Sequence, residues 1–179
     1  MNRRSFTLLT LAAATVLAVP RLFAQTASAP AFTFDSIDGG SYDTADWRGK
    51  PVLIVNTASM CGFAPQYNDL QQLSDTLGDK VVVLTVPSDD FNQELGSDAE
   101  VKEYCAINFD LSLPMTTITA VAKGKVHPFY AWVKTQTDFT PGWNFNKVLL
   151  DQNGQIVRSW GSSAKPMGAI KEAMEGLLG

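Results

Sequence analysis

The sequence predicts an α/β domain in which helices flank a central mixed β-sheet. A continuous apolar run over residues 51–55 and a second run over 81–86, apolar except for Thr85, are typical of strands that are buried on both faces. Between these runs the apolar residues recur at helical intervals. Further along, Asn153-Gly154 separates segments 148–150 and 156–160 and indicates a β-hairpin. A strand–helix–strand order that ends in a hairpin favours a mixed sheet between helical layers.

The first half of the chain contains a hairpin signal, a strand and a long helix. Short apolar pieces within residues 31–50 surround Asp38-Gly39-Gly40, which predicts a tight turn between two strands. The strand over 51–55 follows. A helix is then expected from Pro65 to the stop signal at Gly78. Its apolar residues lie three or four positions apart and share one face: Tyr67, Leu70, Leu73 and Leu77.

The second half of the chain adds three helices and a further strand. Ser97-Asp98-Ala99-Glu100 has the form of a capping box and predicts a helix start. Residues 115–121 predict a strand because they are rich in apolar and β-branched residues. His127-Pro128 and Lys165-Pro166 each predict a helix start, since proline is tolerated in the first helical turn.

This order of elements suits a thioredoxin-like architecture. We expect one domain over residues 32–179, preceded by a flexible lead-in over 25–31. Cys61 comes just after the strand at 51–55. It is therefore expected at the carboxyl end of a central strand, where open α/β sheets place reactive groups.

The N-terminus predicts an export signal. Arg3-Arg4-Ser5-Phe6 precedes an uncharged run over residues 7–19, which is too short to span a bilayer. The paired arginines resemble a twin-arginine signal, and a general secretion signal is the alternative. We expect a signal peptide over residues 1–24 with cleavage after Ala24, and a periplasmic mature protein.

Composition and charge narrow the possible partners. The chain has 179 residues, of which 45% are hydrophobic and 18% charged, as in ordinary globular proteins. Removal of residues 1–24 takes away three arginines and no acids, so the net charge falls from −4 to −7. Such an acidic domain is a poor candidate for binding nucleic acid or anionic membranes. We expect neither nucleic-acid binding nor stable membrane insertion.

The two cysteines, Cys61 and Cys105, carry most of the chemical interest. A thiol acts as a nucleophile only as a thiolate, and the N-terminus of a helix favours that anion. The position of Cys61 before the helix at Pro65 meets this condition. In an oxidising compartment, however, an even pair of cysteines is by default a structural disulfide.

Three segments, in order, resemble the signatures of the cysteine-type glutathione peroxidase family. Residues 56–63 (Asn-Thr-Ala-Ser-Met-Cys-Gly-Phe) are similar to the first signature. Residues 86–97 are similar to the second, F-P-C-N-Q-F-G-x-Q-E-P-G-S, and residues 143–147 to the third, W-N-F-x-K. Lesser landmarks lie at 127–132 and at Lys165-Pro166, and several motifs in order are far more specific than one. The resemblance spans about residues 32–178.

The resemblance implies a catalytic tetrad of Cys61, Gln93, Trp143 and Asn144. Physical reasoning supports neutral donors at these positions. Two side-chain amides and an indole N–H can hydrogen-bond a thiolate without adding a negative charge beside it. They can also stabilise the charge that develops on the leaving oxygen of a peroxide.

The second signature departs from the family pattern in its length and charge. Only Asn92 separates Phe91 from Gln93, where the pattern has two residues. A tighter turn would keep Gln93 in place, whereas a simple shortening would rotate its side chain away. Asp89 and Asp90 replace Asn and Gln of the pattern, and we expect both to be solvated loop residues.

Cys105 matches the resolving cysteine of thioredoxin-dependent family members. Ser88 occupies another position where many members carry cysteine, so Cys105 has no competitor. The resemblance implies that Cys61 becomes a sulfenic acid, that Cys105 condenses with it into a disulfide, and that an external dithiol reduces the bond. Cys105 is expected on a helix, which must unwind locally because disulfides need Cα atoms within about 7 Å. A permanent bridge is disfavoured because it would block the nucleophile.

Other chemistries lack their usual residues. His127 is the single histidine and is expected to have a structural role at a helix start, so we expect no metal and no cofactor. One alternative to the peroxidase function is that of a general thiol–disulfide oxidoreductase. Such proteins ordinarily have a C-x-x-C motif, and Cys61-Gly62-Phe63-Ala64 lacks its second cysteine. A peroxide-sensing or binding module with poor turnover is the other, motivated by the altered Gln93 loop.

The reductant and the oligomeric state follow from the resemblance. A resolving cysteine favours a thioredoxin-like protein over glutathione, and the sequence has no evident basic pocket for glutathione. The short segment over residues 135–142 takes the place of the longer oligomerisation loop of tetrameric members. We therefore expect a monomer that reduces hydrogen peroxide or organic and lipid hydroperoxides.

Overall fold

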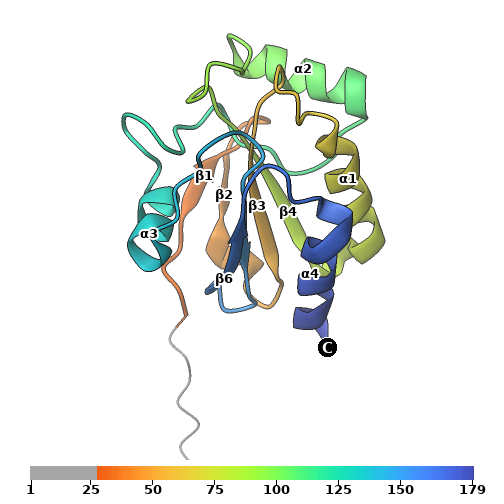
Figure 1. Cartoon of the computed structure of the whole chain (residues 1–179), viewed down its shortest axis with the longest axis vertical. Coiled ribbons are helices and arrows are strands. Elements are labelled where there is room, and N and C mark those ends of the chain that lie inside the picture. Colours follow the sequence, from red (N-terminus) through yellow and green to blue (C-terminus); the bar gives the residue numbers. More distant parts are fainter. Residues whose placement is uncertain (1–27) are drawn as a thin grey trace, which may run out of the picture.

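The computed structural model describes residues 28–179, so the expected signal peptide and the first three residues of the lead-in, 25–27, lie outside the described residues. A four-stranded sheet forms the centre, in the order β4-β3-β5-β6 (Figure 1). Its strands are β3 (Val52–Thr57), β4 (Val82–Pro87), β5 (Lys147–Leu150) and β6 (Ile156–Trp160). β3 pairs with β4 in parallel and with β5 in antiparallel, and β5 pairs with β6 in antiparallel. The mixed sheet predicted from the sequence is thus confirmed.

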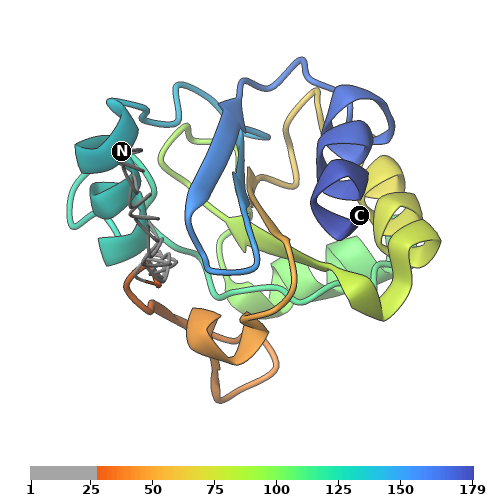
Figure 2. The same ribbon diagram turned by 90° about the horizontal axis from the view of Figure 1, so that it is seen from below.

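Helices cover both faces of this sheet. Helices α1 (Gln66–Leu77) and α4 (Lys171–Leu178) lie on one side, and α3 (Pro128–Thr137) lies on the other (Figure 2). Helix α2 (Asp98–Phe109) crosses one end of the sheet (Figure 1). A small hairpin of β1 (Thr33–Asp35) and β2 (Ser41–Asp43) and two 3-10 turns (Thr44–Trp47 and Gly78–Lys80) complete the regular structure. Within residues 28–179, no helix has the length and apolar character that a bilayer span requires.

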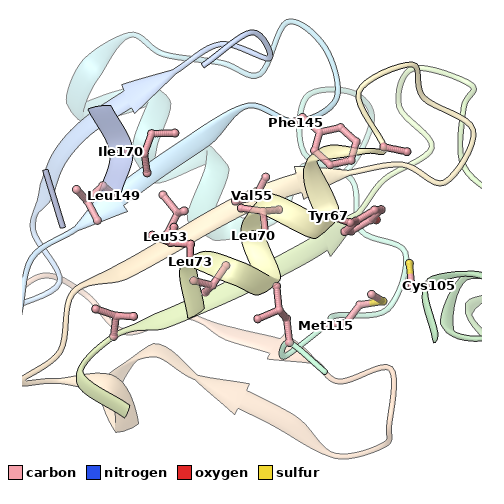
Figure 3. Close-up of a cluster of buried hydrophobic side chains, with 14 of the residues drawn as sticks. Leu53, Val55, Tyr67, Leu70, Leu73, Cys105, Met115, Phe145, Leu149 and Ile170 are labelled. Carbon is pink, nitrogen blue, oxygen red and sulfur yellow. The ribbon is translucent and has the colours of Figure 1, made fainter. Parts of the chain in front are cut away.

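The hydrophobic core is divided by the sheet into two clusters. Leu53, Val55 and Leu149 of the sheet pack against α1 and Ile170 on one face (Figure 3). The other face buries Ile54, Leu84 and Val148 against α3. Because β3 is covered on both faces, its side chains are buried without alternation, as the apolar run predicted. Full burial of each such aliphatic side chain contributes about 1.5–3 kcal/mol.

Several sequence predictions are confirmed in detail. α1 buries the four predicted residues and ends at Gly78, whose φ is +60°. Ser97 caps α2, and its hydroxyl accepts from the Glu100 N–H at 3.4 Å. The two hairpins form around Gly39-Gly40 and Gly154, all with positive φ.

The strand predicted over residues 115–121 is wrong. This segment forms no strand; only isolated bridges join Met115 to Thr85 and Thr116 to Ser36. The hydroxyls of Thr116 and Thr119 both bond to the Thr117 carbonyl, and such local bonds compete with a β-ladder.

The last helix begins later than predicted. Lys165-Pro166 opens an irregular turn over Pro166–Ile170, and the regular helix α4 starts at Lys171. Gly168 interrupts the helical backbone, with φ −118° and ψ −125°. Lys165-Pro166 therefore marks the start of the irregular turn and not the start of the regular helix.

Candidate active site

Cys61 lies in the loop that joins β3 to α1. β3 ends at Thr57, and the side chain of Cys61 is only 5% exposed. α1 begins at Gln66, five residues later, so Cys61 precedes the helix by more than one turn. Its Sγ accepts the Phe63 backbone N–H at 3.5 Å. The N–H that bonds this sulfur therefore belongs to the tight turn at Cys61–Ala64 and not to the first turn of α1.

Gln93 is brought beside this loop despite the missing residue. Asn92 adopts a left-handed conformation with φ +56°, and its N–H bonds to the Asp89 carbonyl at 2.9 Å. This conformation is open to asparagine and tightens the turn. The Gln93 carbonyl then accepts the Met60 N–H at 2.9 Å, which fixes Gln93 next to the residue preceding Cys61. Of the two outcomes expected for the shortened loop, the structure has the tighter turn.

Asn144 joins Gln93 at the same place. Its side-chain amide donates to the Gln93 side-chain oxygen at 3.2 Å. Asn144 is fully buried, and its Oδ1 has no hydrogen-bond partner among residues 28–179. Gln93 and Asn144 thus form a pair of neutral side-chain amides, and the contact of this pair with the Cys61 sulfur stays a prediction.

The loop that carries Trp143 and Asn144 is held by Asn56 of β3. The Asn56 amide donates to the Trp143 carbonyl at 3.0 Å, and its Oδ1 accepts the Asn146 N–H at 3.0 Å. Phe145, with φ +60°, turns the chain into β5 and is buried against Tyr67. The Trp143 side chain itself is 41% exposed and packs on Phe91 with a ring separation of 5.4 Å. Trp143 therefore lies at the surface, whereas its neighbour Asn144 is buried.

The two unusual acids of the shortened loop have structural contacts. The Asp90 carboxylate accepts three successive N–H groups, from Val121, Ala122 and Lys123, at 2.6–3.0 Å. Asp89 is exposed and accepts the Glu94 N–H at 3.2 Å. The prediction that both are merely solvated is wrong for Asp90, which fastens one loop to another.

Cys105 is on α2 and is almost completely buried, at 1% exposure. Burial raises the pKa of its thiol to about 11, and the negative charge of Glu94 acts in the same direction. In Figure 3 its sulfur lies at the edge of the core, on the side of Tyr67. Both Cys61 and Cys105 are free thiols in the structure.

The two cysteines border different hollows of the surface. Cys61 borders one of about 410 Å³, together with Met60, Tyr104 and Phe109. Cys105 borders a smaller one of about 130 Å³ with Asp38 and Met115. The two thiols thus border different hollows, and their pairing in a disulfide, with the local unwinding of α2 that it needs, stays a prediction.

His127 has the structural role that the sequence predicted. Its Nδ1 accepts the Phe129 N–H at 3.2 Å at the start of α3, so Nε2 carries the proton and donates to the Thr33 carbonyl at 2.9 Å. Its ring stacks on Phe34 with a centroid separation of 4.0 Å. Burial lowers the pKa of this imidazole.

Sequence reasoning did not assign roles to two residues close to the site. Lys147 is fully buried, and its ammonium donates to the Gln66 side chain and to the carbonyls of Ser162 and Ala164. It thus ties the start of α1 to β5 and to the loop after β6. Glu94 turns inward beneath the Cys61 loop. Both residues are in the quoted signatures, but nothing in a single sequence shows that a charged side chain is buried.

Comparison with known proteins identifies the family. The glutathione peroxidase family model matches residues 30–134. The hydroperoxy fatty acid reductase gpx1 of Synechocystis is 36% identical over 150 residues, covering 75% of this chain and 87% of the relative. The glutathione peroxidase homolog BsaA of Halalkalibacterium halodurans is 37% identical over 153 residues, covering 82% and 97%. The glutathione peroxidase-like peroxiredoxin 2 of Saccharomyces cerevisiae is 36% identical over 147 residues, covering 78% and 90%.

Solved structures agree on the fold. The crystal structure of T. cruzi GPX1 superposes with a TM-score of 0.64 at 26% identity, covering 82% of this chain and 94% of that one. A thioredoxin family thiol:disulfide interchange protein from Chlorobium tepidum reaches 0.66 at 16% identity, covering 87% and 99%. The predicted thioredoxin-like fold is confirmed.

Proposed function

Because the chain belongs to the glutathione peroxidase family, we propose that it is a thiol peroxidase that reduces hydrogen peroxide or organic hydroperoxides to water or alcohols. The observation that carries this proposal is the juxtaposition of the Cys61 loop with the Gln93–Asn144 amide pair. A cysteine with a backbone donor and neutral amide neighbours is equipped for attack on an O–O bond.

In the first step the Cys61 thiolate attacks one peroxide oxygen. An S–O bond forms, the O–O bond breaks, and the leaving oxygen takes a proton to give water or an alcohol. Cys61 becomes a sulfenic acid. The amides of Gln93 and Asn144 and the indole N–H of Trp143 are the groups proposed to stabilise the charge on the departing oxygen.

In the second step the Cys105 sulfur replaces the sulfenic hydroxyl. An S–S bond forms, the S–O bond breaks, and the hydroxide leaves as water with the proton of Cys105. A thioredoxin-like dithiol protein then reduces the disulfide. The peroxiredoxin names of fungal relatives support a protein reductant over glutathione.

The substrate class is proposed to include lipid hydroperoxides. A relative from Synechocystis carries the name hydroperoxy fatty acid reductase. Met60, which borders the same hollow as Cys61, is 62% exposed and offers apolar surface beside the thiol. The monomeric state expected from the short segment at residues 135–142 would keep this surface accessible.

The deciding experiment is peroxide consumption by the mature protein with a thioredoxin system, compared with glutathione. We expect turnover with thioredoxin and its loss in Cys61→Ser. Turnover no faster than that of a free thiol would reject the enzyme and favour a peroxide-sensing module. Disulfide exchange without peroxide consumption would favour a general oxidoreductase.

Export to the periplasm is proposed from residues 1–24 alone. Intact mass of the protein recovered from the periplasm would test it, with a new N-terminus at Gln25 expected. An uncleaved chain that stays in the cytoplasm would contradict the proposal.

A further inference from the structure

A hollow of about 410 Å³ opens beside Cys61, between the nucleophile loop and helix α2. One wall is formed by residues 59–62 and 64–65 of the loop after β3, and the other by Tyr104 and Phe109 of α2. The two walls meet because α2 crosses the end of the sheet at which β3 ends (Figure 1). Hydrogen peroxide would fill only a small part of this space, since a water molecule takes up about 30 Å³ in the liquid. The hollow therefore has room for the organic part of a larger hydroperoxide, next to the sulfur.

The lining of this hollow is uncharged. No Asp, Glu, Lys or Arg among residues 28–179 borders it, whereas Met60 contributes an apolar side chain. A second hollow, of about 390 Å³, also borders the nucleophile loop, but its lining includes Asp69 and Lys165 and does not include Cys61. Removal of apolar surface from water is favourable, whereas a charged ligand group loses hydration that an uncharged lining does not replace. The hollow at Cys61 is therefore suited to an uncharged, apolar group.

Aromatic packing holds the α2 wall of the hollow in place. The rings of Tyr104 and Phe109 meet edge to face, with 5.9 Å between their centroids. Phe109 also packs on the buried Tyr67 of α1, with a centroid separation of 5.0 Å. Tyr104 and Phe109 are themselves half-buried, so part of each side chain remains accessible. A wall that is already ordered lowers the entropy cost of binding a ligand against it.

We propose that this hollow is a subsite for the alkyl chain of an organic hydroperoxide, with the peroxide group at Cys61 and the chain against Met60, Tyr104 and Phe109. The inference rests on the proposed peroxidase function and adds the place where the chain binds. The chain comes singly from solution and not from a bilayer, because the net charge of −7 expected for the mature protein disfavours anionic membrane surfaces. Preference for long chains is then set jointly by the nucleophile loop and α2.

A series of unbranched alkyl hydroperoxides, from ethyl to octyl, tests the subsite through the second-order rate of Cys61 oxidation. Each methylene that is half removed from water should raise this rate about twofold, so octyl hydroperoxide should react about 60-fold faster than ethyl hydroperoxide. The ratio of these two rates reports chain binding, because the bond changes at sulfur are the same for both. Equal rates across the series overturn the subsite and leave the peroxidase function intact. Absence of Cys61 oxidation by every hydroperoxide would instead reject the peroxidase function.

Two variants compare apolar side chains inside and outside the hollow. Met60→Ser removes a side chain that borders the hollow, and Ile107→Ser removes one of α2 that is 73% exposed and does not border it. Because both side chains are exposed, both variants should fold. We expect the octyl-to-ethyl rate ratio to fall about fivefold in Met60→Ser and to keep its wild-type value in Ile107→Ser. A ratio that is unchanged in Met60→Ser, or lowered equally in both variants, contradicts the proposal.

Binding is also measurable without turnover, with 1-octanol as a probe that has the form of the reduced product. The reduced mature protein is labelled with ¹³C-methyl methionine, and the Met60 methyl signal is assigned by its loss in Met60→Ser. We expect this signal to shift and saturate as 1-octanol is added, whereas the methyl of the fully buried Met174 stays unmoved. Ethanol at the same concentration should move neither signal. An unmoved Met60 signal overturns the subsite whether or not the protein proves to be a peroxidase.

The source of the chain is tested with vesicles of phosphatidylglycerol and phosphatidylcholine that carry phospholipid hydroperoxide. We expect octyl hydroperoxide in solution to oxidise Cys61 faster than the same concentration of hydroperoxide in vesicles. The reverse order would overturn the assignment to a single chain in solution and would indicate that the protein acts at a bilayer surface.

Discussion

The Asn144 side chain donates a hydrogen bond to the Gln93 side chain at 3.2 Å, joining two loops whose residues lie 51 positions apart. One loop follows β4 and the other precedes β5, and both strands flank β3. The Cys61 loop follows β3, so the sheet order places the three loops together. The pair is therefore a direct product of the fold rather than of local sequence.

Loss of this pair should slow oxidation of Cys61. Asn144→Ala removes one buried amide and leaves Gln93 without its partner. We expect the second-order rate of Cys61 oxidation to fall about 100- to 1,000-fold, the order of effect seen when one preorganised donor is lost. Stopped-flow oxidation under single turnover measures it, with the exposed Asn68→Ala as the control. An unchanged rate in Asn144→Ala would remove Asn144 from the mechanism.

Cys105 is predicted to act only after the first oxidation. Cys105→Ser should consume one equivalent of peroxide as fast as wild type and then stop, because no intramolecular thiol can replace the sulfenic hydroxyl. A single-turnover measurement of peroxide consumption reports the oxidation of Cys61, and steady-state turnover with thioredoxin reports whether the disulfide step follows. Full thioredoxin-dependent cycling in this variant would reject the resolving role.

The fold was predictable because hydrophobic periodicity follows directly from strand and helix geometry. The apolar runs of β3 and β4 and the spaced leucines of α1 are such cases. The strand predicted over residues 115–121 does not form. Threonine favours strands on average, but the hydroxyls of Thr116 and Thr119 bond to the nearby Thr117 carbonyl instead. Propensity does not reveal such competition.

The candidate site was predictable only in part. The motifs identified Gln93 and Asn144, but not that Asn92 would adopt a left-handed turn that keeps Gln93 in place. The inward turn of Glu94 depends on which side of the loop faces the core. The side of a loop that faces the core is set by tertiary packing, and residue spacing in the sequence does not predict it.

Asp90 is predicted to contribute strongly to stability. Its carboxylate accepts three N–H groups of the segment that leads into α3, so Asp90→Ala leaves three donors without their acceptor. We expect a loss of about 2–3 kcal/mol in the free energy of unfolding. Urea unfolding measures it, with Asp89→Ala as the matched exposed change. Equal stabilities of the two variants would contradict the role assigned to Asp90.

Lys147 should give the protein a characteristic pH dependence of stability. The residue is fully buried, and within residues 28–179 its ammonium donates to three uncharged oxygens, of Gln66, Ser162 and Ala164. Burial lowers its pKa to about 8, although Asp69 acts in the opposite direction. An unfolded lysine titrates near ~10.4. Below pH 8 the folded state carries the full cost of the buried charge, and between about pH 8 and 10.4 that cost disappears because the folded lysine loses its proton first.

The unfolding free energy of wild type should therefore rise, relative to that of Lys147→Met, by about 2–3 kcal/mol as pH increases through this window. Comparing the two proteins is essential, because burial also raises the pKa values of Tyr67, Tyr130 and Cys105, and these groups lower the stability of both at high pH. Urea unfolding at pH values on either side of the window measures the difference. Lys165→Met, at an exposed lysine, corrects for the loss of one positive charge. If the difference in unfolding free energy between wild type and Lys147→Met stays constant with pH, the charge of Lys147 does not destabilise the folded state. Its three hydrogen-bond acceptors would then compensate fully for the loss of hydration.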